Sequence, residues 1–351
     1  MGQTTITPLA GFSPNGVGWL APGEGGYTFL GTGNLERGLA FGNNHLYLVS
    51  RNGGSFIRIL DKLTGADLGF LNTSTNVSGG TFAVNQVSVG GDGAIYVNNL
   101  TVQSTTSPLK IYRWTSELLS PSLVYSGNAG LAGARVGDSM AVIGSGSSTR
   151  LVLGFGNSPA VSGNNGYTII DPTAGTATAV GFTGTPPLAG DFRLGITFAG
   201  SGQVLGSQGS SLYRYSSFSG ASGTLLGSPL FPDPAGATAD RLMAYAIVGG
   251  VPLLAVLSTG DSHVSLYDVT DLANPIYLAA ANATTTPAAN ANGTGELAWG
   301  DISGDTALLY AMSSNQGIQA FTVTVPEPSV IATFLIGTGV IGFNFLRRRK
   351  S

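Results

Sequence analysis

The chain has 351 residues, with 54 Gly, no Cys and only 9% charged residues, a length that suits one large all-β domain or two ordinary domains. The absence of Cys excludes a disulfide framework, thiolate chemistry and cysteine-based metal sites. The net charge is −3, but the charge is unevenly distributed: residues 347–350 are all basic, whereas residues 1–325, the body, carry 11 Lys and Arg against 17 Asp and Glu. This acidic body argues against nucleic acid as a partner.

The body shows short apolar or alternating runs of four to eight residues and no helical period. Gly, Asn, Ser and Pro separate the runs, which is typical of antiparallel strands joined by tight turns. In chain order the runs are HLYLVS, FIRIL, AIYVNNL, LKIYRW, SMAVIG, RLVLGF, YTIID, SLYRY, LLAVLS, VSLYDV, ALLYAM and IQAFTVTV. This pattern predicts an all-β fold.

One short segment recurs along the body and is followed each time by a second strand, often a third, and an outer strand. The copies lie at 37–42, 85–90, 134–139, 192–197, 242–247 and 296–301, between 48 and 58 residues apart. Six units of about four strands predict a β-propeller-like ring of about six blades. An irregular β-sandwich or solenoid is the alternative.

In such a ring the recurring segment is the first strand of each blade and lines the axis. Small residues there allow neighbouring blades to approach closely, a role we expect for Gly38, Gly137, Gly195, Ala40 and Ala298. The stretch at 18–31 is expected to supply the last strand of the final blade and so close the ring.

The recurring segments also carry most of the charge that points to a binding site. Arginines recur at matching positions, and acidic residues lie beside them; the full set is Arg37, Arg135, Arg193, Glu36, Asp138, Asp191 and Glu296. A ring of guanidinium groups would attract a carboxylate or an acidic sugar. The alternative is that these Arg–acid pairs join adjacent blades and bind no ligand.

The sequence contains no strong metal motif. His45 and His263 have no Glu or Cys at metal-ligand spacing, so no zinc site is expected. Calcium is the weaker alternative, at acidic turns that each hold at most two carboxylates: Asp268/Asp271, Asp301/Asp305 and Asp92. Capping of the turns by these side chains is sufficient to explain them, and no cofactor is predicted.

The C-terminus has a different character from the body. Residues 330–346 contain no charge and, as a helix, would span about 25 Å, close to the thickness of a hydrocarbon core. Arg347, Arg348, Arg349 and Lys350 follow at once. By the positive-inside rule this pattern predicts a single transmembrane helix with its C-terminus in the cytoplasm and the body outside.

Pro326, Glu327 and Pro328, followed by an apolar segment and an Arg-rich end, resemble the PEP-CTERM sorting signal of exported bacterial proteins. The resemblance covers about 27 residues. It implies that an exosortase, a membrane-embedded transpeptidase-like protease, recognises the tripeptide and removes the helix. The hosts of such proteins typically make exopolysaccharide, floc or biofilm. The three motif residues would then act as a substrate and not as catalysts.

The opening residues, MGQTTITPLAGFSPNG, lack the basic and apolar parts of an export leader, so we expect a leader that is missing from this sequence. The expected organisation is an exported β-propeller-like domain at 1–324 and a sorting signal at 325–351. The leading hypothesis is a non-enzymatic, cell-surface or extracellular protein with a role in the matrix, in biofilm or in polysaccharide binding. The alternative is a propeller hydrolase or lyase that acts on acidic glycans.

Overall fold

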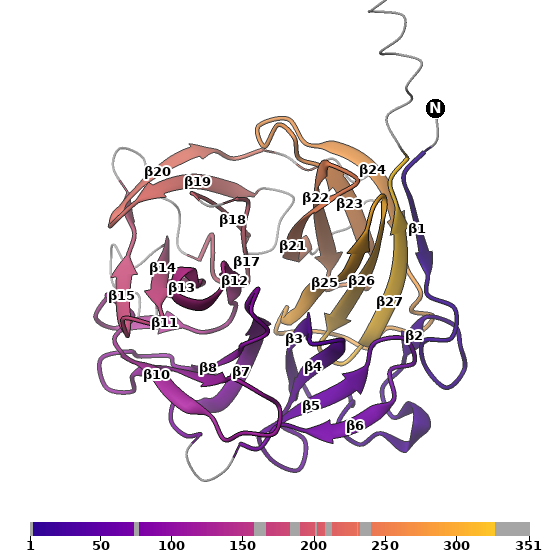
Figure 1. Ribbon diagram of the computed structural model, residues 1–351, viewed down its shortest axis with the longest axis horizontal. Coiled ribbons are helices and arrows are strands. Elements are labelled where there is room, and N and C mark those ends of the chain that lie inside the picture. The colour runs from indigo at the N-terminus through magenta and orange to yellow at the C-terminus, as the bar shows by residue number, and fades with distance from the viewer. Residues whose placement is uncertain are drawn as a thin grey trace, which may run out of the picture.

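The computed structural model describes residues 3–73, 77–157, 166–182, 190–200, 202–207, 213–229, 231 and 240–326. These residues form six sheets arranged as the blades of a ring (Figure 1). Helical structure among them is limited to two 3₁₀ turns, at Glu24–Gly26 and Gly146–Ser148. The prediction of an all-β, six-bladed, propeller-like ring is confirmed.

Each blade begins with its strand nearest the axis and continues outward along the sequence. Blade 1 contains β3 (Glu36–Gly42), β4 (His45–Ser50), β5 (Phe56–Asp61) and β6 (Asp67–Phe70). Blade 2 contains β7 (Phe82–Val89), β8 (Ile95–Leu100), β9 (Leu109–Trp114) and β10 (Ser122–Gly127). In blade 3 the inner position is shared by β11 (Ala134–Val136) and β12 (Ala141–Ile143), which pair with β13 (Arg150–Asn157), and β14 (Gly166–Asp171) and β15 (Thr176–Ala179) follow.

The second half of the ring repeats this plan. Blade 4 contains β17 (Gly195–Phe198), β18 (Gln203–Ser207), β19 (Arg214–Ser219) and β20 (Ser222–Gly227), with β16 (Gly181–Phe182) outside β20. Blade 5 contains β21 (Asp240–Val248), β22 (Val251–Ser258), β23 (Val264–Asp268) and β24 (Ile276–Ala281). Blade 6 contains β25 (Gly295–Ser303), β26 (Thr306–Ser313) and β27 (Gly317–Thr324). The six recurring segments of the sequence fall at or beside the six inner strands.

The N-terminus closes the ring by adding strands to blade 6. β1 (Thr5–Pro8) pairs antiparallel with the outer edge of β27, from Thr5 opposite Thr324 to Pro8 opposite Phe321. The stretch expected to close the ring contributes only β2 (Trp19–Leu20), because the Gly-rich residues after it form a 3₁₀ turn. The closing strand therefore lies further toward the N-terminus than expected. The ring is closed by the pairing of β1 with β27, the first and last strands of the described chain.

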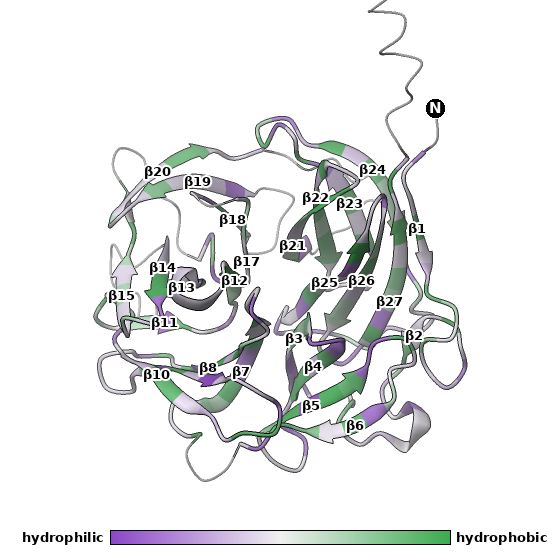
Figure 2. Cartoon of the chain, in the orientation of Figure 1, coloured by the Kyte–Doolittle hydropathy of each residue, from purple (hydrophilic) through white to green (hydrophobic). Residues whose placement is uncertain are grey.

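The core lies between the faces of neighbouring blades, where buried apolar residues of adjacent sheets form clusters. Figure 2 shows hydrophobic residues along many of the strands. Near the axis the sheets approach so closely that some positions have no room for a side chain. A Cβ at Gly195 would lie 1.7 Å from the backbone oxygen of Arg241 in the next blade, and one at Gly38 would lie 2.8 Å from Cα of Gln86. Glycine at these two positions allows the expected close approach of the blades.

The described chain ends at Pro326. Glu327 and Pro328 of the motif, the predicted transmembrane helix at 330–346 and the basic residues Arg347, Arg348, Arg349 and Lys350 lie outside the described residues. Within the described ranges, no helix has the length and apolar character needed to span a membrane.

Candidate functional site

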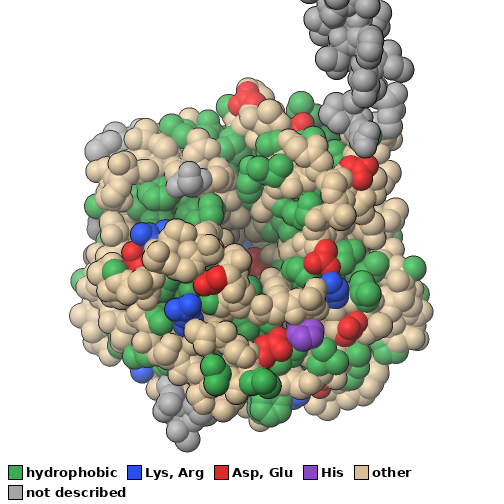
Figure 3. Space-filling model, viewed as in Figure 1, with side chains coloured by type: hydrophobic (Ala, Val, Ile, Leu, Met, Phe, Trp, Pro, Cys, Tyr) green, Lys and Arg blue, Asp and Glu red, His purple; other side chains and the backbone are tan. Residues whose placement is uncertain are grey.

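The six inner strands surround an axial channel that differs in chemistry between its two ends. A cavity of about 570 Å³ lies where the inner strands begin, and we call it the arginine pocket. A cavity of about 200 Å³ lies further along the same strands, and we call it the apolar sleeve. The space-filling view shows the hollow at the middle of the ring (Figure 3).

The arginine pocket brings together four guanidinium groups from four blades. Arg37 comes from β3, Arg135 from β11, Arg193 from the residues before β17, and Arg241 from β21. Among the described residues that line the cavity, Asp138 is the one acidic side chain, so the lining carries a formal charge of +3. Such a site attracts anions, because desolvated guanidinium groups bind carboxylate or phosphate in a fixed geometry.

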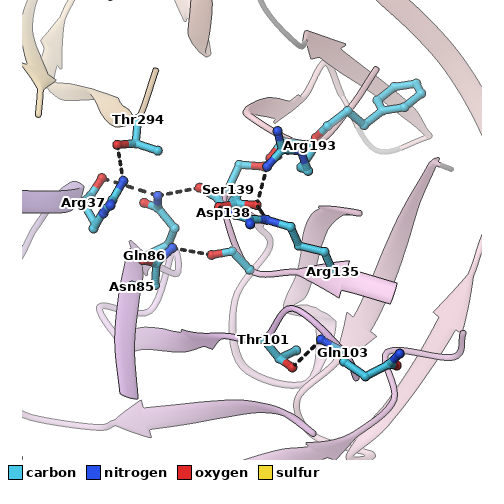
Figure 4. Close-up of polar contacts among 12 residues, drawn as sticks. Arg37, Asn85, Gln86, Thr101, Gln103, Arg135, Asp138, Ser139, Arg193 and Thr294 are labelled. Carbon is cyan, nitrogen blue, oxygen red and sulfur yellow. Dashed lines mark hydrogen bonds and ion pairs between the residues drawn. The ribbon is translucent and has the colours of Figure 1, made fainter. Parts of the chain in front are cut away.

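Two of the four arginines are held by the same buried carboxylate. Arg135 donates from Nε to Oδ2 of Asp138 at 2.6 Å and from Nη2 to Oδ1 at 2.8 Å. Arg193 donates from Nη1 to Oδ2 at 3.0 Å (Figure 4). These hydrogen bonds raise the pKa of Arg135. Because Asp138 belongs to blade 3 and Arg193 to blade 4, this contact joins neighbouring blades as well as shaping the pocket.

The other two arginines have no carboxylate within ion-pair distance among the described residues. Arg37 donates from Nη1 to the hydroxyl of Thr294 in blade 6, but its buried Nε has no hydrogen-bond acceptor among the described residues. The buried Nε of Arg241 also lacks an acceptor in the part of the chain that the structure describes. Burial lowers the pKa of both side chains, and Arg193 lowers that of Arg241 further. A bound anion would relieve this desolvation cost.

Neighbouring residues hold the arginines in place. Gln86 of β7 donates from Nε2 to the backbone oxygen of Asp138 at 2.7 Å and to that of Arg37 at 3.4 Å, which connects blades 1, 2 and 3. The guanidinium of Arg241 fills the space that a side chain at Gly293 would need, since a Cβ there would lie 1.9 Å from Nη1. The pocket is therefore built into the packing of the ring.

The seven residues singled out from the sequence do not form one group. Arg37, Arg135, Arg193 and Asp138 line the arginine pocket, whereas Glu36, Asp191 and Glu296 lie elsewhere. Glu36 accepts from the backbone nitrogen of Gly31 at 2.7 Å, and burial raises its pKa. Asp191 accepts from Nε of Arg214 at 2.9 Å. Glu296 lines the apolar sleeve, where burial raises its pKa well above the usual value.

Sequence reasoning missed Arg241. This residue directly precedes the recurring segment of blade 5, in the way that Arg193 precedes Leu194 and Gly195 in blade 4. Extending each segment by one residue toward the N-terminus would have found it. Sequence reasoning also missed a partner of His45, whose Nδ1 lies 2.7 Å from Oε1 of Glu117, 72 residues further along the chain.

Three of the acidic residues considered for calcium cap their own turns, and the other two contact neighbouring side chains. Asp268 accepts from the backbone nitrogen of Thr270 at 2.8 Å, Asp271 from that of Ala273 at 2.9 Å, and Asp92 from that of Ala94 at 3.2 Å. Asp301 lies 2.5 Å from Nζ of Lys62, and Asp305 accepts from the hydroxyl of Thr306. In the part of the chain that the structure describes, no three His, Asp or Glu gather in a metal-binding arrangement.

Comparison with solved structures supports the architecture. An aldose sugar dehydrogenase from Streptomyces coelicolor in its PQQ-bound form aligns with a TM-score of 0.54 and 14% identity over 92% of this chain and 98% of that chain. The major allergen Mala s 1 of Malassezia sympodialis aligns with a TM-score of 0.51 and 11% identity over 81% and 90%. At these identities the similarity shows the fold alone.

Comparison with sequence families finds two matches. Residues 23–159 match a domain of unknown function (DUF4623), and residues 324–350 match the PEP-CTERM protein-sorting motif. No curated protein matches the chain. The sorting motif implies export, anchoring in the membrane before processing, and recognition by an exosortase. The chain is therefore an exported β-propeller-like protein that carries a C-terminal PEP-CTERM sorting motif.

Proposed function

We propose that this protein is released at the cell surface or into the extracellular matrix after its tail is processed, and that it binds an acidic polysaccharide there without turning it over. The observation that carries this proposal is the arginine pocket: four guanidinium groups from four blades surround one cavity with a single carboxylate among its described lining. Uronic acid residues present a carboxylate on every ring, and guanidinium groups bind carboxylates in a bidentate manner.

Arg37 and Arg241 are the residues that we assign to the ligand. Asp138 already neutralises part of the charge of Arg135 and Arg193, whereas Arg37 and Arg241 each keep a buried Nε that finds no acceptor within the described ranges. A ligand carboxylate placed between them would receive charge-assisted hydrogen bonds, each of which contributes roughly 1.5–3 kcal/mol when both partners are desolvated.

Binding is tested by calorimetric titration with a short oligogalacturonate, with a neutral maltooligosaccharide of equal length as the comparison. We expect the acidic oligomer to bind and the neutral one not to bind. Arg37→Gln and Arg241→Gln should each weaken binding by about tenfold or more. The matched control is Arg150→Gln, since Arg150 pairs with Asp171 in a partly exposed contact outside the pocket. Equal binding of the acidic and neutral oligomers would refute the proposal.

Hydrolysis or elimination of acidic glycans remains the alternative. Hydrolysis by the usual route needs two carboxyl groups, one on each side of the scissile bond. In the described lining of the pocket Asp138 is held by two guanidinium groups and has no second carboxyl beside it. The test is prolonged incubation with oligogalacturonate, followed by measurement of new reducing ends and unsaturated uronate. Product formation that Asp138→Asn abolishes would favour the enzyme.

Processing of the tail is tested by mass spectrometry of the mature protein from a host that contains an exosortase. We expect the chain to end near 326–329 and to be recovered outside the cytoplasm. In the same host without the exosortase, the basic residues at 347–350 should be retained. Recovery of the intact chain in the cytoplasm of both hosts would contradict the proposed route.

A further inference from the structure

The arginine pocket is closed on all sides around the axis. Its described lining includes residues from every blade, namely Arg37, Phe82, Arg135, Arg193, Arg241 and Thr294 in blades 1 to 6. A ligand inside it is therefore encircled by the inner strands. This arrangement differs from an open groove, in which a long polymer can lie with both of its ends free.

The channel beyond the pocket changes character within two residues. Leu39, Met140 and Met243 follow Arg37, Asp138 and Arg241 by two residues along the chain. These three side chains line the apolar sleeve, which is much smaller than the pocket.

A polyuronate chain could not pass through this sleeve at low energetic cost. The sleeve is smaller than the pocket, about 200 Å³ against about 570 Å³, and its described lining contains no Lys or Arg. A carboxylate that entered it would lose hydration without meeting a cation. Glu296, the one acidic side chain among the described residues of the sleeve, gives a carboxylate no favourable partner. An acidic glycan that enters the arginine pocket therefore does not continue into the sleeve.

We propose that the pocket binds the end of an acidic polysaccharide chain and not its interior, an inference that rests on the proposed function. The terminal uronate lies at Arg37 and Arg241, and the chain leaves past Arg135 and Arg193. Arg37 is buried, whereas Arg135, Arg193 and Arg241 are half-buried, so the terminal uronate reaches furthest into the protein at Arg37. The volume of about 570 Å³ is that of a small-molecule site and holds a few sugar rings.

Chain-end recognition has a consequence for stoichiometry. A protein that coats the interior of a polymer binds in numbers proportional to polymer length. A protein that binds chain ends saturates at one copy per recognised end, however long the polymer is. In a matrix, such a protein caps or tethers polysaccharide chains instead of covering them.

The experiment uses oligogalacturonates of two, three and six residues and a polygalacturonate of known mean length. Calorimetric titration gives affinity and stoichiometry for each. We expect affinity to rise until the pocket is filled and then to level off, with one protein bound per chain for every length. Arg37→Gln and Arg241→Gln should weaken binding of all lengths by the same factor, and Arg150→Gln should change none of them.

The outcomes separate the inference from the function on which it rests. A number of bound proteins that grows with polymer length, lost in Arg37→Gln, would overturn chain-end recognition and leave polysaccharide binding intact. Absence of binding to every length would overturn both. Thermal unfolding of each variant without ligand identifies any that fails to fold, and the more conservative Arg37→Lys, which keeps the charge but not the guanidinium fork, then takes its place.

Discussion

Replacing Asp138 by Asn should have opposite effects on stability and on ligand binding. The carboxylate is 2% exposed and accepts three hydrogen bonds, at 2.6, 2.8 and 3.0 Å, from guanidinium groups in two blades. Asn keeps the shape of the side chain but removes the charge, and its amide nitrogen cannot accept a hydrogen bond. The variant therefore loses both ion pairs and keeps at most part of the hydrogen bonding.

The magnitude follows from the burial of the three side chains. Breaking a fully buried ion pair costs about 3–5 kcal/mol, because it leaves an uncompensated charge away from water. Here Arg135 and Arg193 remain 30% and 22% exposed, so water can solvate them after the carboxylate is lost. We expect Asp138→Asn to lower the free energy of unfolding by about 2–3 kcal/mol. The pocket lining would at the same time change from a formal charge of +3 to +4.

Ligand binding should respond in the other direction, since Arg135 and Arg193 become available to an anion. Oligogalacturonate affinity is expected to rise severalfold, measured by calorimetry below the unfolding range, while urea denaturation reports the loss of stability. Asp171→Asn is the matched control, because its pair with Arg150 is partly exposed and contributes less than about 1 kcal/mol. Unchanged stability in Asp138→Asn would refute the view that Asp138 stabilises the contact between blades 3 and 4. A loss of affinity as large as that of Arg37→Gln would show that Asp138 itself contacts the ligand.

Three further substitutions test the fold around the pocket. Burial raises the pKa of Glu296 above its ordinary value of 4.5, so the folded state holds this proton more tightly and stability falls as pH rises above 4.5. Burial also raises the pKa of Glu36, so Glu296→Gln should reduce that decline in urea titrations between pH 4 and 8 without abolishing it. Gly195→Ala should destabilise the protein by more than about 2 kcal/mol, because the added Cβ would overlap the backbone of Arg241. The control is Gly202→Ala, where an added Cβ would have no atom within 4 Å and the same denaturation assay should show almost no change. Ile6→Ala removes a buried side chain of the closing strand and should lower the free energy of unfolding by about 2–4 kcal/mol; a value near zero would show that β1 does not hold the ring closed.

The blade repeat was predictable because the inner strands obey the strictest local constraint. At the axis neighbouring sheets meet, so small residues recur there at the spacing of a blade, as Gly38 and Gly195 illustrate. The closing strand was less predictable, because β1 is a four-residue edge strand whose pairing with β27 joins residues more than 300 positions apart. Nothing in its local pattern identifies that partner.

Part of the site was also within reach of the sequence. The repeat predicted that Arg37, Arg135 and Arg193 share one site, but not that Glu36 lies outside it, because Glu36 lies beside a register shift in β3 and accepts from the backbone of Gly31. The sharing of Asp138 by two arginines could not have been foreseen, because it depends on how blade 4 is placed against blade 3. The missing acceptors at Nε of Arg37 and Arg241, on which the proposed ligand site depends, follow from the same placement of the blades.

The distribution of charge determines where on the protein a polyanion is attracted. Residues 1–325 carry 11 cationic and 17 acidic side chains, yet four of those cations line one cavity at the axis. The remaining seven are outnumbered by the acids on the rest of the body, which should repel a polyanion along most of its length. Attraction is strongest where the guanidinium groups converge. The sleeve beyond that place is smaller and has no Lys or Arg in its described lining, so it does not attract a polyanion further into the ring. A polyuronate therefore meets a favourable field only where one of its ends enters the ring.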